Sequence, residues 1–117
     1  MRDQTKTFLD LRDNRSKKTP QAKVGSMNIS VTSPCSQSTI EDLGITNWPI
    51  WTCDPSTFPW TYSEKETCLI LEGDITVTPD GGEPVRFGVG DLVIFPEGMC
   101  CTWEVHKAVK KHYRFGN

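Results

Sequence analysis

Short runs of β-branched and aromatic residues recur through the second half of the chain, with glycine- and proline-containing turns between them. The expected strands are 67–71, 75–78, 85–87, 92–95, 101–105 and 109–115, and the expected turns are 73–74, 79–82, 88–90 and 96–98. Strands that return roughly every 8–12 residues are typical of an antiparallel sandwich or barrel. No stretch after residue 44 keeps a helical period, so the sequence predicts an all-β body.

The segment before these strands has weaker patterns. Residues 27–32 alternate enough to predict a first strand. Residues 38–41 have the form of a helix capping box, with Ser38 as the cap, and Gly44 is a natural stop, so a short helical turn is expected at 38–43. Residues 48–62 are rich in aromatic side chains and contain three prolines, which suits edge strands and turns.

Length and charge predict one folded domain at 27–117, preceded by a flexible basic tail at 1–26. Residues 1–23 carry seven Lys or Arg against three Asp, whereas the rest of the chain carries six basic and twelve acidic residues. The acidic body would repel phosphate, so nucleic acid could bind at most weakly, through the tail. No apolar run approaches the ~18 residues needed to span a membrane, and we expect a soluble protein.

The tail has three interpretations: a solvated terminus, a remnant of a targeting peptide, or an arm that docks on a partner. Three apolar side chains close together (Phe8, Leu9 and Leu11) would supply the contacts of such an arm.

The five cysteines are spaced irregularly and form no CxxC motif, and the two histidines are not paired with them at zinc-site spacing. A structural zinc site is therefore not expected. The thiols are interpreted as small apolar fillers in a reducing compartment.

Several blocks, in order, resemble the small single-domain cupins related to the cupin domain of ureidoglycine aminohydrolase, over residues 27–116. They are Trp48-Pro49-Ile50-Trp51, Phe58-Pro59-Trp60-Thr61-Tyr62, Glu66-Thr67-Cys68, Leu71-Glu72-Gly73, Gly90-Asp91-Leu92-Val93, Phe95-Pro96-Glu97-Gly98 and Cys101-Thr102-Trp103-Glu104-Val105. The resemblance implies a cupin-type antiparallel β-sandwich or barrel of jelly-roll form. Small plant cupins of this type include one associated with plastid transcription. That likeness implies a chloroplast location and a place beside the plastid-encoded RNA polymerase.

The metal-binding motifs of cupins are only partly present. Glu66 fits the carboxylate position, but Trp60, Tyr62 and Cys101 stand where the resemblance places histidine ligands. Manganese, iron or nickel needs about three nitrogen or oxygen ligands here. We therefore expect no metal and no cofactor, and the sequence favours a protein that is not an enzyme.

Strand alternation predicts which side chains face the barrel interior. The expected pocket residues are Trp60, Tyr62, Glu66, Cys68, Cys101 and Trp103. Glu66 is interpreted as a core acid hydrogen-bonded to Tyr62; the alternative makes it the proton acceptor of a nucleophilic Cys101. His106 is expected in a turn, and the run Lys110-Lys111-His112 is interpreted as a solvated strand end.

Two function hypotheses follow. Apolar side chains on both faces of the strands, together with Trp48 and Trp51 as anchors, favour a non-catalytic binding or assembly subunit with protein partners in a large plastid assembly. A homodimer is a separate alternative for the partner. The alternative is a small-molecule-binding or metal-dependent cupin that acts on a ureide-like nitrogen compound.

Overall fold

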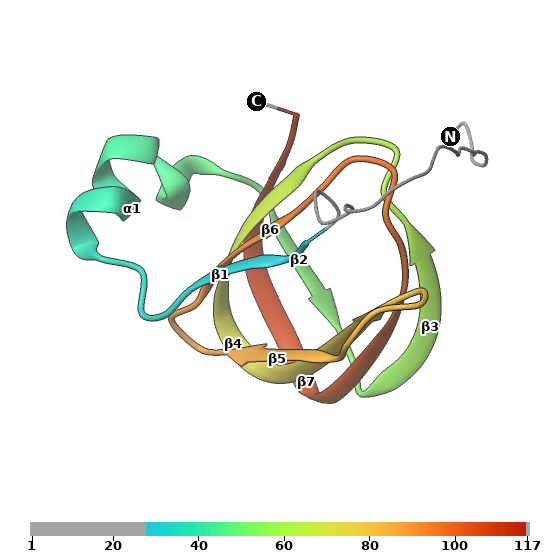
Figure 1. The fold of residues 1–117 in the computed structure, drawn as a ribbon. Helices are drawn as coiled ribbons and strands as arrows, with labels where there is room; N and C mark the ends of the chain where they lie inside the picture. Colours follow the sequence, from blue (N-terminus) through green and yellow to red (C-terminus); the bar gives the residue numbers. More distant parts are fainter. Residues whose placement is uncertain (1–27, 117) are drawn as a thin grey trace.

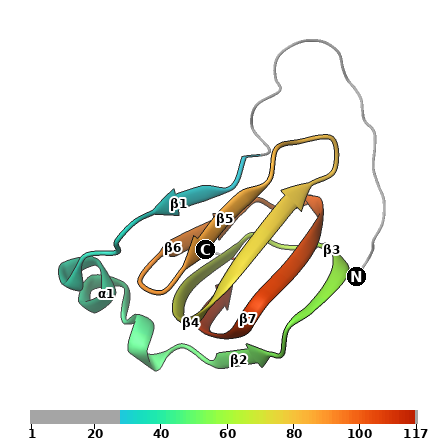
Figure 2. The same ribbon diagram turned by 90° about the horizontal axis from the view of Figure 1, so that it is seen from below.

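The computed structural model describes residues 28–116, which form a single antiparallel sheet rolled around a core (Figures 1 and 2). Its elements are β1 (Ser30–Thr32), α1 (Gln37–Leu43), a 3-10 turn η2 (Ile45–Asn47), β2 (Ile50–Cys53), β3 (Ser56–Thr61), β4 (Glu66–Pro79), β5 (Val85–Gly88), β6 (Leu92–Phe95) and β7 (Cys100–Phe115). The all-β prediction is confirmed. Phe8, Leu9, Leu11 and the predicted strand start at Met27 lie outside the described residues.

The sheet is built on two long strands. β4 and β7 pair from Glu66 opposite Phe115 to Pro79 opposite Cys101. The strand order is β1-β6-β4-β7-β2; in addition, β3 pairs with β7 and β5 pairs with β4. The strands β2 and β3 each pair only with β7, as expected of edge strands, with Pro59 inside β3 and Pro49 immediately before β2.

Two predicted chain breaks are wrong. β4 runs straight through Gly73 and Asp74, which the sequence placed in a turn, and β7 is one strand that includes His106. Register shifts between Ile70 and Ile75 bend the pair without ending it. Gly73 lies in this bent stretch with φ of +120°, so this glycine marks a β-bulge and not a reversal of the chain direction.

The helix prediction is nearly correct. α1 ends at Leu43 and is capped by Gly44, which adopts the left-handed conformation with φ of 65°. The cap, however, is Ser36 and not Ser38: the backbone N–H of Thr39 donates to Ser36 Oγ at 3.2 Å. Ser36 is extended and its hydroxyl satisfies a free helix N–H, which leaves Ser38 inside the helix.

The core has two parts, one on each face of the sheet. The larger part fills the barrel and includes Cys68, Val93, Phe95, Cys101 and Trp103. A smaller cluster of Ile45, Leu69 and Leu92 lies on the other face, where Ile40, Trp48 and Leu71 pack against it. The α1–η2 segment of the chain itself therefore covers the second apolar face that the sequence indicated.

Within residues 28–116, no helix is long and apolar enough to cross a membrane.

Candidate functional site: an aromatic cavity inside the barrel

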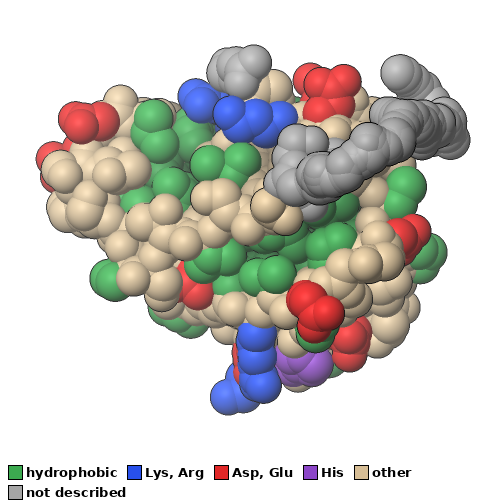
Figure 3. Space-filling model, in the orientation of Figure 1, with side chains coloured by type: hydrophobic (Ala, Val, Ile, Leu, Met, Phe, Trp, Pro, Cys, Tyr) green, Lys and Arg blue, Asp and Glu red, His purple; other side chains and the backbone are tan. Residues whose placement is uncertain are grey.

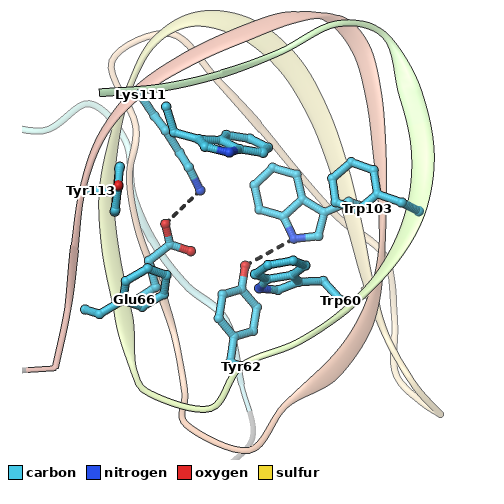
Figure 4. Close-up of a pocket in the computed structure, with 9 residues that line it drawn as sticks. Trp60, Tyr62, Glu66, Trp103, Lys111 and Tyr113 are labelled. Atoms are coloured by element: carbon cyan, nitrogen blue, oxygen red, sulfur yellow. Dashed lines mark hydrogen bonds and ion pairs between the residues drawn. The ribbon is translucent and has the colours of Figure 1, made fainter. Parts of the chain in front are cut away.

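A cavity of about 190 Å³ opens inside the rolled sheet. Its lining is almost entirely aromatic, with two charged side chains among the rings (Figure 4). The lining residues are Trp51, Phe58, Trp60, Tyr62, Glu66, Trp103, Lys111, Tyr113 and Phe115. They come from β2, β3, β4 and β7 and from Tyr62 just after β3, so the rolling of the sheet itself builds the cavity wall.

The two charges form a buried ion pair. Lys111 Nζ donates a hydrogen bond to Glu66 Oε2 at 2.7 Å, and the two residues are only 4% and 3% exposed. Figure 4 shows the second carboxylate oxygen of Glu66 turned toward the middle of the cavity. The cavity therefore presents a hydrogen-bond acceptor beside an ammonium group, and its lining is neutral in total.

Lys111 is also held by aromatic rings. Its Nζ lies 4.8 Å from the ring centre of Trp51 and 4.7 Å from that of Trp103. Trp51 is the cross-strand neighbour of Lys111 in the β2–β7 ladder, so strand register sets the first contact. Cation–π attraction over two indole faces compensates part of the hydration that the ammonium loses on burial.

Tyr62 contributes a neutral hydroxyl to the wall. Trp103 Nε1 donates to Tyr62 Oη at 3.1 Å. Burial, reinforced by the nearby Glu66 carboxylate, raises the pKa of Tyr62 well above 10, so the phenol keeps its proton. This hydroxyl therefore accepts from Trp103 and still has its own O–H to donate.

The aromatic wall is internally packed. The ring of Phe58 stacks on Trp103 at a centroid distance of 6.0 Å, and the ring of Tyr62 stacks on Phe95 at 4.8 Å. Phe58 and Trp103 are paired residues in the β3–β7 ladder, so their stacking also follows from register. Rings held in this way form a preformed surface for a flat ligand.

Four of the six predicted pocket residues line the cavity: Trp60, Tyr62, Glu66 and Trp103. Cys68 and Cys101 are buried in the neighbouring core but are not part of the lining. Of the predicted partner anchors, Trp51 lines the cavity, and Trp48 packs against the smaller core cluster under the Arg114 guanidinium. Sequence reasoning missed Phe58, Lys111, Tyr113 and Phe115.

Lys111 and His112 are not a solvated strand end, because both side chains are buried. Lys111 faces the cavity, while His112 Nδ1 lies 2.9 Å from the backbone oxygen of Trp48 on the other face. The signal for Lys111 was its position in the alternation: Val109 and Tyr113, two residues away on either side, belong to or pack against the same core. His106 lies within β7, with Nε2 2.8 Å from Thr76 Oγ1, and not in a turn.

The expected Glu66–Tyr62 hydrogen bond is also wrong, since Glu66 pairs with Lys111 and the Tyr62 hydroxyl pairs with Trp103. Cys101 fits the filler interpretation. Burial raises the pKa of its thiol to about 12, and its Sγ contacts the backbone oxygen of Trp60 at 3.5 Å.

Cysteine alkylation is expected to distinguish the adjacent residues Cys100 and Cys101 by their rates of labelling. Burial also raises the pKa of Cys68 to about 12, so at about pH 8 only about one in ten thousand of the Cys68 and Cys101 thiols is ionised. Cys100 is exposed. Iodoacetamide should label Cys100 in the folded protein and reach Cys68 and Cys101 only after denaturation, as measured by peptide mass mapping. Rapid labelling of folded Cys101 would contradict this burial.

The four positions that the cupin resemblance assigns to metal ligands do not fit a metal. Glu66 is committed to Lys111, Tyr62 and Cys101 keep their protons, and the Trp60 indole has no lone pair to offer. Among the described residues, no three His, Cys, Asp or Glu side chains are grouped closely enough to hold a metal ion. The ammonium of Lys111 is instead the cation that accompanies Glu66.

Comparison with known proteins identifies the domain family of the chain. The EutQ-like cupin domain matches residues 40–113. A DUF861 family protein from Thermotoga maritima is 39% identical, with a TM-score of 0.73 over 75% of this chain and 99% of that one. Protein Q of ethanolamine utilization from Salmonella typhimurium is 27% identical, with a TM-score of 0.53 over 57% of this chain and 54% of that one.

The EutQ protein of Clostridium difficile is 22% identical, with a TM-score of 0.53 over 57% of this chain and 52% of that one, and supports the fold alone. The matched region thus covers about half of each EutQ protein. No curated protein matches the chain in sequence. With its antiparallel rolled sheet and a domain match over most of the described residues, the chain belongs to the family of EutQ-like cupin domains.

Proposed function

We propose that this cupin is a binding protein for a small, neutral, planar molecule that carries both a hydrogen-bond donor and an acceptor at one edge. The observation that supports the proposal is the buried Glu66–Lys111 pair set in the wall of an aromatic cavity. Buried charges are costly unless they are paired. A pair that lines a cavity offers its remaining hydrogen-bonding capacity to a ligand.

The cavity volume limits the ligand to about one ring. At about 190 Å³, it is somewhat larger than the roughly 150 Å³ engineered cavity that binds benzene. It is smaller than the roughly 300–1,000 Å³ of pockets that take drug-sized ligands. The stacked side chains of Phe58, Trp103 and Tyr62 suit a flat molecule of this size.

The charge of the lining argues for a neutral ligand. An anion would meet the Glu66 carboxylate, and a cation would meet the Lys111 ammonium, since the two groups are only 2.7 Å apart. An amide or urea-like group matches both, because its N–H can donate to Glu66 Oε1 and its carbonyl can accept from Lys111. The ureide-like compounds of the alternative sequence hypothesis have this chemistry, without any need for a metal.

Benzamide is a suitable probe, because it is flat, neutral and small. Titration into ¹⁵N-labelled protein should shift the indole N–H resonance of Trp103, with an affinity in the millimolar range or tighter. Toluene, which has the ring but no amide, should bind more weakly. The proposal fails if benzamide leaves the Trp103 resonance unmoved, or if benzoate or benzylamine binds better than benzamide.

Trp60→Ala is expected to weaken benzamide binding by up to about tenfold, since one aromatic contact contributes about 0.5–1.5 kcal/mol. Trp60 is 46% exposed, so the free energy of unfolding should change by less than about 1 kcal/mol. Ile50→Ala is the matched control: Ile50 is 49% exposed but does not line the cavity, and its replacement should leave binding unchanged. Equal effects of the two replacements would contradict the site.

A second candidate is the assembly subunit of the first sequence hypothesis. Trp60 and Phe115 lie at the cavity with 46% and 44% of their surface exposed, and such rings can anchor a protein partner. Figure 3 shows hydrophobic side chains near the middle of one face, with charged groups mainly around its edge. These observations favour a contact with a protein partner.

A chloroplast location and a role beside the plastid-encoded RNA polymerase are proposed from the sequence blocks alone, and the relatives named above are bacterial. Gel filtration of a gently lysed extract, with antibody detection, tests the assembly hypothesis. Elution with a very large complex supports a subunit role. Elution as a monomer or homodimer contradicts it and leaves ligand binding as the function.

A further inference from the structure

We propose that Lys111 captures an aldehyde or ketone in the cavity as a reversible imine, with Glu66 moving the protons. The inference rests on the proposed function, because it places a carbonyl compound in the same cavity, but it adds a covalent activity. The covalent activity depends on the reactivity of Lys111 Nζ as well as on the fit of the ligand in the cavity.

The surroundings of this nitrogen are unusual for a lysine. Its side chain is 5% exposed, and Glu66 is the one acceptor found for it among residues 28–116. Two indole rings, those of Trp51 and Trp103, cover its other sides without offering an oxygen or nitrogen acceptor. When Lys111 transfers its hydrogen-bonded proton to the Glu66 carboxylate, the lysine amine becomes neutral and is only weakly solvated. A neutral lysine amine that is shielded from water by rings can attack a carbonyl carbon.

Glu66 is placed to carry out both proton transfers. Its Oε2 lies 2.7 Å from Nζ, within hydrogen-bond reach, and its other oxygen faces the cavity (Figure 4). The same carboxyl group can therefore take a proton from the amine and later give one to an oxygen atom of the bound compound.

Imine formation on Lys111 proceeds in two stages. Glu66 removes a proton from the Lys111 ammonium, and the nitrogen lone pair attacks the carbonyl carbon to give a carbinolamine. The C–O bond then breaks as Glu66 returns its proton, and the oxygen leaves as water with a hydrogen from the nitrogen. The products are a protonated imine on Lys111, an ionised Glu66 and one water molecule. No oxidant, reductant or metal is needed.

Lys110 provides an internal comparison on the same strand. It is the neighbour of Lys111 in β7, is only half-buried, and does not line the cavity. Alternation along the strand points the two side chains to opposite faces of the sheet. A reaction driven by general lysine basicity would label both residues, whereas a reaction driven by the cavity would label Lys111.

The test uses benzaldehyde, which has nearly the shape of benzamide, followed by reduction with sodium cyanoborohydride. Peptide mass mapping should find one benzyl group on Lys111, at least about tenfold in excess over Lys110 at early times. Benzamide should compete with the labelling. Lys111→Arg keeps a cation beside Glu66 and should abolish the adduct at this position, while Lys110→Arg should leave the labelling of Lys111 unchanged.

Glu66→Gln should slow the labelling of Lys111 by at least about tenfold, because the amide cannot accept the proton. The imine proposal is overturned if benzaldehyde shifts the Trp103 indole resonance but labels Lys111 no faster than Lys110. The proposed function would survive that result. If neither benzaldehyde nor benzamide perturbs Trp103, both proposals fail.

Discussion

Lys111→Met is expected to lower the free energy of unfolding by about 3–5 kcal/mol, because it leaves a buried carboxylate without its cation. Glu66 is 3% exposed, and Lys111 is its ion-pair partner at 2.7 Å. Methionine matches the length of the lysine stem, so the loss reflects charge more than packing. Urea unfolding followed by far-ultraviolet circular dichroism measures it.

The double replacement Glu66→Met with Lys111→Met separates charge from volume. Apolar pairs often replace buried ion pairs with little loss of stability, so the double variant should recover more than half of the single variant's deficit. If the single variant is as stable as the parent protein, Glu66 is hydrated through the cavity and the desolvation argument is wrong. If the double variant recovers nothing, the loss comes from packing.

Gly73→Ala is expected to be at least as damaging, with a loss of about 3 kcal/mol or more. An added Cβ would lie 2.8 Å from the Val109 Cα and 3.0 Å from the Ala108 carbonyl oxygen, and these backbone atoms cannot turn aside as a side chain can. The φ of +120° adds strain, because L residues rarely adopt it. Thermal and urea unfolding of the purified variant, or its failure to fold at all, measure the effect.

Gly81→Ala is the control for backbone strain alone. Gly81 also has a positive φ, of 75°, but nothing lies within 4 Å of its added Cβ. Its replacement should cost only about 1 kcal/mol. Equal losses at the two positions would show that the close approach of β4 and β7 at Gly73 is not what requires glycine.

Most of the fold could be predicted from local patterns, because strands and tight turns carry short-range signals. The hairpin turn at 79–82, the strands β5 and β6, and the glycine stop of α1 were all predicted correctly. The continuity of β4 could not be predicted in this way, because Gly73 has the same local signature in a bulge as in a turn. Only the pairing with a distant strand distinguishes the two.

The candidate site was half predictable for a similar reason. Alternation predicted Trp60, Tyr62, Glu66 and Trp103 as pocket residues, and all four line the cavity, although Trp60 is 46% exposed. The partner of Glu66, however, is Lys111, which lies 45 residues away in the chain. Its neighbours Lys110 and His112 make this segment look like a solvent-exposed stretch of polar residues. Which charges meet inside a barrel depends on register, and register is decided by the whole sheet.

The pairing of β4 with β7 also suggests an order of events during folding. The pairing can begin where Pro79 meets Cys101, since the connecting loop is shortest there, and extend toward Glu66 and Phe115. Glu66 and Lys111 would then meet late, because they lie at the far end of the ladder and become neighbours only as the pairing extends. The proposed starting region is thereby separated along the strands from the Glu66–Lys111 pair, so changes to this pair should mainly accelerate unfolding and leave the folding rate nearly unchanged, whereas Trp103 lies only two residues from Cys101.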